Sequence, residues 1–293
     1  MLPSQTQRVL MLFAVIIGTV AWWWLGGFLP PSDGLHGWSL FDASTGKAPA
    51  VGLLLLTALP ALLAASFVAV SGNPISGVFC VALAGTIAHH GNGFAGVARR
   101  AADSGGQSAL FPQLAVELIL GIALLALLLL GLQAARRLWV QRVPLRLRSR
   151  HLGEQLDLLK LDQKSLTAGL VTAAIGAVLS AGLLRNEDPQ QVAGGLVLAF
   201  SLAALIGHAV SPNHRPFASL IAPAVVGIVG YAWAWQSLRG TAENDALLGA
   251  LYGNELPGLA MGLPLHYLTA GVLGCTIGIG IGQLVEKAKL AEG

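Results

Sequence analysis

The sequence is poor in charged residues. Aspartate, glutamate, lysine and arginine make up 11% of the 293 residues, less than half of the roughly 25% that is typical of a soluble globular domain. Hydrophobic residues make up 55% of the chain, and the mean hydropathy is +0.70. This composition excludes a disordered chain and argues against an ordinary soluble domain. We therefore expect the protein to fold in a lipid bilayer.

Cysteine and the common catalytic motifs are also scarce. Cys80 and Cys275 are the two cysteines, and each lies in an apolar stretch, which excludes a disulfide framework and a cysteine-based metal quartet. The sequence has no His-Glu-x-x-His motif, no Gly-x-Ser-x-Gly motif, no aspartate-rich prenyl-diphosphate motif and no ATP-binding motif. We therefore expect no catalytic residues, no metal ion and no cofactor, and an enzyme is the less favoured class.

One glycine motif has the wrong surroundings for its usual ligand. Gly91, Gly93 and Gly96 have the spacing of a dinucleotide-binding fingerprint. That fingerprint follows a β-strand in a βαβ unit, whereas these glycines follow an apolar stretch that we predict to be helical. The segment is interpreted as a flexible loop.

Long apolar runs dominate the rest of the chain. Because they are continuous and do not alternate with polar residues, they indicate transmembrane helices and not barrel strands. The fold class predicted is an all-α, polytopic membrane helical bundle of about eight transmembrane helices. The predicted spans are 9–29, 51–70, 74–90, 114–135, 166–184, 191–210, 216–236 and 263–284. The third is short and follows a four-residue turn, so it is expected to form a tight antiparallel hairpin with the second.

The basic residues gather on one side of this topology. An even number of spans places both termini on the same side, together with twelve of the 17 lysines and arginines. The positive-inside rule makes that side cytoplasmic, so we predict a multi-pass protein of the plasma (inner) membrane with both termini in the cytoplasm. If the third segment did not cross, the basic middle loop would lie on the side opposite Arg8.

The basic middle loop covers residues 136–164. Its arginines are followed by a leucine-rich stretch with interspersed charges, which predicts an amphipathic helix at the membrane surface, in contact with anionic lipid headgroups. The alternative is a docking surface for a soluble protein partner. Nucleic acid is excluded as a partner because aromatic residues are nearly absent from the basic run. The arginines are Arg136, Arg137, Arg142, Arg146, Arg148 and Arg150.

A short internal repeat suggests that the chain has two halves. Residues 69–73 (Ala-Val-Ser-x-Asn) recur at 209–213, and after a two-residue insertion Pro74 to Gly85 aligns with Pro216 to Gly227. A real duplication would give two parallel four-helix halves, 1–135 and 166–293, joined by a basic cytoplasmic linker at 136–165 and meeting at a central interface. The alternative is chance similarity between two alanine- and valine-rich helices.

Few ionisable residues lie inside the predicted spans. Glu117, His89, His90 and His266 all fall at the outer end of the predicted bundle, and they are the candidate residues of a substrate or proton pathway, because an intramembrane ionisable group is costly. A metal site is not expected, since adjacent helical histidines point about 100° apart. The alternative is that these residues lie in the hydrated headgroup zone.

Two functions remain open from the sequence. The first is a small-solute or ion transporter or channel, with a path between the two halves. The glycine series Gly271, Gly274, Gly278 and Gly282 supports it, because small residues let helices approach closely. The second is a non-catalytic membrane subunit or scaffold of a larger membrane complex, with a protein partner at the 136–164 loop.

Overall fold

The protein is a bundle of membrane-length helices. The computed structural model describes residues 5–26, 39, 64–69, 74–89, 93–140, 159–239 and 246–292. The long helices are α1 (Gln5–Gly26), α5 (Gln107–Val140), α6 (Gln163–Leu183), α7 (Pro189–Val210), α8 (Phe217–Leu238) and α11 (Val272–Glu292). The shorter elements are α3 (Pro74–Ala88), α4 (Phe94–Asp103), α9 (Ala246–Tyr252), η2 (Gly258–Ala260), α10 (Pro264–His266) and the π-helix η3 (Tyr267–Gly271). The predicted all-α membrane bundle is confirmed.

Six helical segments in the described part of the chain are long and apolar enough to cross a membrane. They correspond to the first, fourth, fifth, sixth, seventh and eighth predicted spans. The third predicted span forms α3, whose 15 residues extend about 22 Å at 1.5 Å per residue, less than the roughly 30 Å of a hydrocarbon core. Residues 64–69 of the second predicted span are helical, and its other residues lie outside the described part.

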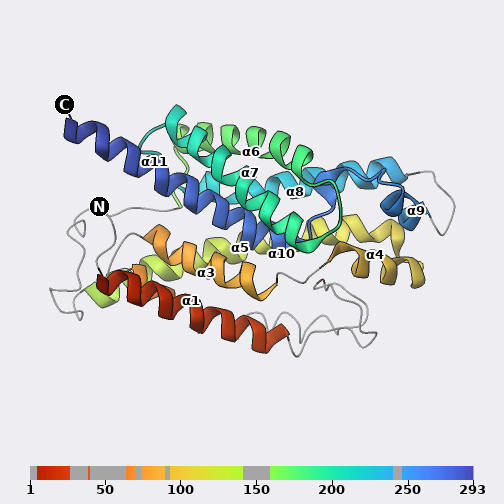
Figure 1. The fold of residues 1–293 in the computed structure, drawn as a ribbon, viewed down its shortest axis with the longest axis horizontal. Helices are drawn as coiled ribbons and strands as arrows, with labels where there is room; N and C mark the ends of the chain where they lie inside the picture. The colour runs from red at the N-terminus through yellow and green to blue at the C-terminus, as the bar shows by residue number, and fades with distance from the viewer. Residues whose placement is uncertain are drawn as a thin grey trace.

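The helices run side by side along the long axis of the molecule (Figure 1). The start of α1, the end of α5, the start of α6, the α7–α8 turn and the end of α11 lie at one end, which we call the terminal end. The other end, which we call the opposite end, holds α4 and α9, with the α6–α7 turn on the same side, and α10 lies nearer the middle of the molecule. This alternation matches an even number of passes.

Glycines allow α11 to lie directly on α7. A Cβ added to Gly274 would stand 2.6 Å from the carbonyl oxygen of Val197, and one added to Gly278 would overlap the carbonyl oxygen of Ser201. Lipid tails are as apolar as leucine, so close van der Waals packing of this kind is what favours helix association in a bilayer. The glycine series therefore forms a helix-contact face, as its spacing predicts.

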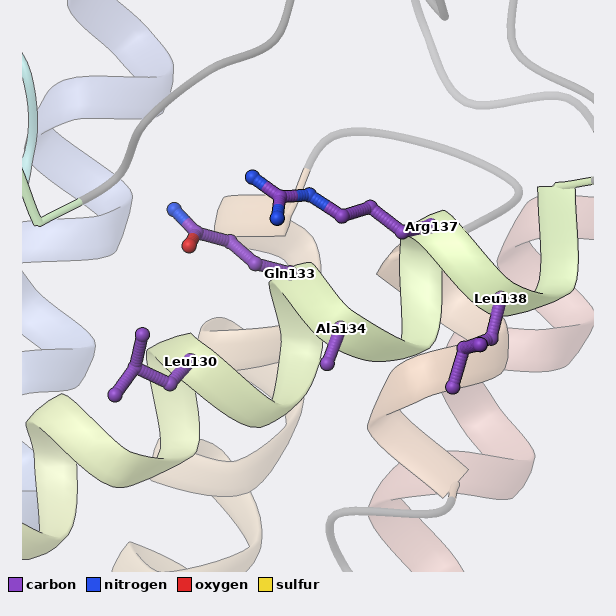
Figure 2. A pocket seen from close by; sticks show the side chains of 5 residues that line it. All are labelled: Leu130, Gln133, Ala134, Arg137 and Leu138. Carbon is purple, nitrogen blue, oxygen red and sulfur yellow. The ribbon is translucent and has the colours of Figure 1, made fainter.

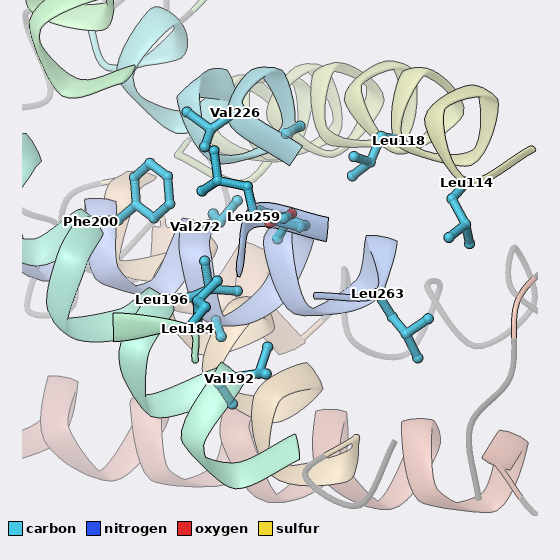
Figure 3. Packing of buried hydrophobic residues seen from close by; sticks show 14 of the residues in the cluster. Leu114, Leu118, Leu184, Val192, Leu196, Phe200, Val226, Leu259, Leu263 and Val272 are labelled. Atoms are coloured by element: carbon cyan, nitrogen blue, oxygen red, sulfur yellow. The ribbon is translucent and has the colours of Figure 1, made fainter. Parts of the chain in front are cut away.

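The core lies between α5, α7, α8 and α11. Phe200 of α7, Val226 of α8 and Val272 of α11 are buried in it and lie close together in Figure 3. The outer faces carry exposed apolar side chains, such as Leu127 on α5 and Leu170 on α6. In a bilayer these side chains contact lipid.

Candidate functional site

Three of the four predicted site residues are enclosed by protein. The exposed fractions of His89, Glu117 and His266 are 5%, 3% and 2%. His90 lies outside the described residues. Burying an ionisable group among apolar side chains costs free energy unless polar partners compensate. The surroundings of the three residues therefore decide what they can do.

His89 and His266 come together from different parts of the chain. His89 directly follows α3, and His266 ends α10, where the last membrane-spanning segment begins. α3 packs against η3, which directly follows His266, so the segments that carry the two histidines are neighbours. The Trp22 ring of α1 packs edge-on against His89 with the centroids 5.3 Å apart, so this tryptophan faces the bundle, whereas Trp23 is largely exposed.

Glu117 lies in the first half of α5, the helix that begins at the opposite end. Its Oε2 atom accepts a hydrogen bond of 2.5 Å from the hydroxyl of Ser39. α5 packs against α8, the helix of Tyr231, and the Tyr231 ring packs edge-on against Tyr267 with centroids 6.2 Å apart. Tyr267 is the residue after His266, so a tyrosine pair links the Glu117 environment to the histidines. We call His89, Glu117, Tyr231, His266 and Tyr267 the opposite-end cluster.

The backbone next to this cluster is irregular. Between Pro257 and Val272 the chain forms η2, then α10, then the π-helix η3, before α11 starts. The hydroxyls of Tyr231 and Tyr267 donate to the carbonyl oxygens of Gly262 and Leu259, which satisfies acceptors that a broken helix leaves open. π-Helical turns inside α-helices occur frequently at functional sites.

The proton position on His266 follows from its hydrogen bond. The backbone N–H of Leu263 donates to Nδ1 of His266 at 3.1 Å. Nδ1 is therefore the acceptor, and a neutral His266 carries its proton on Nε2. A backbone donor thus fixes the tautomer and the ring orientation.

The packing between the two predicted halves is reciprocal. α5 of the first half packs against α8 of the second, and α11 of the second packs against α3 of the first. A Cβ on Gly85 of α3 would stand 2.6 Å from Cγ2 of Thr269, and one on Gly227 of α8 would stand 2.8 Å from Cδ1 of Leu118 on α5. Each of the two glycines that the sequence repeat aligns thus lies against a side chain of the other predicted half, and Gly227 also lies against Tyr267. If the same sequence alignment is continued by four residues, His89 aligns with Tyr231.

A second polar cluster lies at the terminal end. His208 of α7 is buried, with an exposed fraction of 5%, and its Nε2 atom is 3.4 Å from Oε2 of Glu286 on α11. The side-chain amide of Asn213 donates to Oε1 of the same Glu286 at 2.9 Å. Asn213 has a φ of 57°, a left-handed conformation that asparagine tolerates better than most residues. Glu286 therefore joins the α7–α8 turn to α11.

His214 supports this turn as a neutral side chain. Its Nδ1 donates to the carbonyl oxygen of Ser211 at 2.8 Å, because a carbonyl can only accept, and its Nε2 accepts from the Ser219 hydroxyl at 3.2 Å. Burial is the main cause that lowers the pKa of His214 below the ordinary value, and nearby His208 lowers it further. The ring lies 5.4 Å from that of His208.

Sequence reasoning missed several of these residues. His208 and His214 are recognisable as neighbours in the sequence, but Glu286 is indistinguishable there from the other charges near the end of α11. Tyr231 and Tyr267 look like ordinary aromatic residues of apolar helices. The available signal was the density of proline and glycine between Pro257 and Gly271, which indicates a broken helix.

The chemistry available to these clusters is limited. Within the described residues, no group of three or more histidine, cysteine, aspartate or glutamate side chains is placed to hold a metal ion. The buried carboxyl and imidazole groups can bind, hold and release protons. A hollow of about 410 Å³ lies elsewhere, along the last turns of α5, and is lined by Leu130, Gln133, Ala134, Arg137 and Leu138 (Figure 2).

Comparison with known protein families, with curated proteins and with solved structures found no match to this chain. The geometry of the two clusters and the packing of the two predicted halves are therefore the observations that bear on function.

Proposed function

We propose that this multi-pass membrane protein transports a small solute or an ion, and that a proton is bound and released at the opposite-end cluster during transport. The observation that carries the proposal is the burial of His89, Glu117 and His266, three ionisable residues that come from separate elements of a membrane-spanning bundle. Ionisable residues inside membrane bundles are retained mainly for function, because they lower stability unless they are paired.

The position of the cluster supports a pathway between the halves. Its residues lie in or directly after α3, α5, α8 and the α10–η3 segment. These elements adjoin the contacts of α5 with α8 and of α11 with α3. In transporters with internal repeats, substrate and coupling-ion sites lie at the repeat interface, next to helices with a broken backbone. Here the broken segment between Pro257 and Val272 adjoins the cluster.

Glu117 is the group best placed to carry the coupling proton. It is a buried carboxyl, and a hydroxyl of Ser39 that donates to it stabilises the charged form. Protonation would remove a charge from the interior and so change the contacts of α5 with its neighbours. We place the terminal end in the cytoplasm, because the topology predicted from the sequence puts most of the basic residues there.

The test is proton flux in liposomes that contain the purified protein and a pH-sensitive dye. An imposed pH gradient should dissipate through the wild-type protein, alone or when a transported solute is added from a panel of ions and small metabolites. Glu117→Gln should lower the protein-dependent flux at least tenfold, about 1.4 kcal/mol of barrier, without loss of folded protein. Glu255→Gln is the matched control, because Glu255 is exposed at the same end. Wild-type flux in Glu117→Gln contradicts the proposal.

A second candidate function is a non-catalytic subunit or scaffold of a larger membrane complex. The basic 136–164 segment favours it, because that segment could dock a soluble protein. Native mass spectrometry after gentle detergent extraction separates the two functions. A stoichiometric partner protein, together with no protein-dependent flux in liposomes, would support the subunit role. Reversing the charges of Arg146, Arg148 and Arg150 should then release the partner.

A further inference from the structure

The last turns of α5 combine exposed apolar side chains with a guanidinium, that of Arg137, that has no partner among the described residues. Leu130, Ala134 and Leu138 are exposed, with exposed fractions of 47% for Leu130 and 70% for Leu138. Gln133 and Arg137 extend from the same helix and lie together on one side of it (Figure 2). With the apolar residues they line the hollow of about 410 Å³.

The height of Arg137 along α5 corresponds to a membrane surface. α5 has 34 residues and is about 51 Å long, which exceeds the roughly 30 Å of a hydrocarbon core. Its apolar membrane-length segment is Ser108–Ala135, so Arg137 follows that segment by two residues. A side chain at this height reaches the lipid phosphates, while leucines on the same stripe contact acyl chains.

Arg137 differs from other arginines of the bundle in what it contacts. The Nε atom of Arg215 lies 3.8 Å from Oδ2 of Asp162, and the guanidinium of Arg239 lies 4.0 Å from the ring centroid of Trp235. Nε of Arg185 donates to the carbonyl oxygen of Gly182 at 3.1 Å. Arg137 makes no hydrogen bond or ion pair with any residue in the described part of the chain. Its charge is therefore available to an external anion.

We infer that this hollow binds one anionic phospholipid, with the headgroup phosphate on Arg137 and an acyl chain along Leu130, Ala134 and Leu138. The guanidinium offers two parallel N–H donors to a phosphate. In the topology predicted from the sequence, the terminal end carries most of the basic residues of the chain, and such a field favours an anionic over a zwitterionic headgroup. This inference does not depend on the transport proposal.

The test is native mass spectrometry of the full-length protein in micelles with equal amounts of phosphatidylglycerol and phosphatidylcholine. The wild-type protein should retain one phosphatidylglycerol, with an affinity about fivefold above that for phosphatidylcholine. Arg137→Gln should remove this preference. Arg99→Gln is the matched control, because Arg99 is exposed at the opposite end of the bundle, and it should keep the preference.

A second variant tests where the lipid lies. Ala134 is exposed, so Ala134→Trp would fill the hollow without entering the core, and it should lower phosphatidylglycerol retention as much as Arg137→Gln does. The inference is overturned if Arg137→Gln keeps the wild-type preference, if both lipids are retained equally by the wild-type protein, or if Ala134→Trp retains the lipid. Proton flux is not part of the readout, so failure of the transport proposal would leave these outcomes unchanged.

Discussion

Gly278 of α11 lies directly against the carbonyl oxygen of Ser201 on α7, with no room between them for a Cβ atom. Two residues away, Gly280 has no heavy atom within 4 Å of the place where its Cβ would be. The same helix thus carries one glycine whose position demands the absence of a side chain and another whose position does not. This contrast makes a matched pair of substitutions.

Gly278→Ala should destabilise the protein by about 1 to 3 kcal/mol, because the methyl group must push α11 away from the α7 backbone. Gly280→Ala should be neutral or stabilising by about 0.5 to 1 kcal/mol, because alanine favours the helical backbone. The free energy of unfolding in mixed detergent micelles, measured by denaturing-detergent titration, checks both values. Equal effects of the two substitutions would show that the α7–α11 contact is looser than the structure indicates.

Tyr231→Phe should cost about 1 to 3 kcal/mol of stability, because it leaves the Gly262 carbonyl oxygen buried without its donor. Tyr252→Phe is the control: Tyr252 is exposed, and its change should cost less than about 0.5 kcal/mol. Thermal unfolding in detergent reports both. If Tyr231→Phe were as mild as the control, the hydroxyl would not be needed to hold the irregular segment.

The stability of the protein should fall as the pH is lowered below about 6.5, the ordinary pKa of histidine. The folded state lowers the pKa of His214, so it favours the neutral ring, and the unfolded chain binds the proton more readily. The contribution of His214 is therefore present above the unfolded-state pKa and is lost as the pH falls through the folded-state pKa.

His214→Gln isolates this contribution, since glutamine can still donate to the Ser211 carbonyl oxygen. The decrease in unfolding midpoint between pH 7.5 and 5 should be smaller in His214→Gln than in the wild-type protein. Parallel pH profiles of the two proteins would mean that another group accounts for the acid sensitivity.

The orientation of the bundle can be measured with single cysteines. We expect Asn186→Cys, in the α6–α7 turn, to react with a membrane-impermeant maleimide in intact cells, and Pro212→Cys, in the α7–α8 turn, to react only after permeabilisation. Both positions are exposed. The native Cys80 and Cys275 are buried and serve as the unlabelled background. The reverse pattern would place the termini outside the cytoplasm.

Much of the candidate site was predictable from composition. Ionisable residues are so rare in the apolar stretches that Glu117, His89 and His266 stand out, and the structure encloses all three. The tyrosine pair and Glu286 were not predictable, because their roles depend on partners distant in the chain: Tyr231 bonds Gly262, and Glu286 contacts His208. The spacing of residues along one helix carries no information about which residue of another helix they contact.

The sequence by itself determined that the protein is a helical membrane bundle, because continuous apolar runs in lipid must satisfy their backbone hydrogen bonds internally. It also determined which face of α11 is small, because Gly274 and Gly278 recur at helical spacing. Tertiary structure alone decided which helices pack against each other across the two predicted halves. These pairs are α5 with α8 and α11 with α3. The reason is physical: lipid is as apolar as the helix surfaces, so detailed van der Waals fit, and not the pattern of hydrophobicity, selects the neighbours.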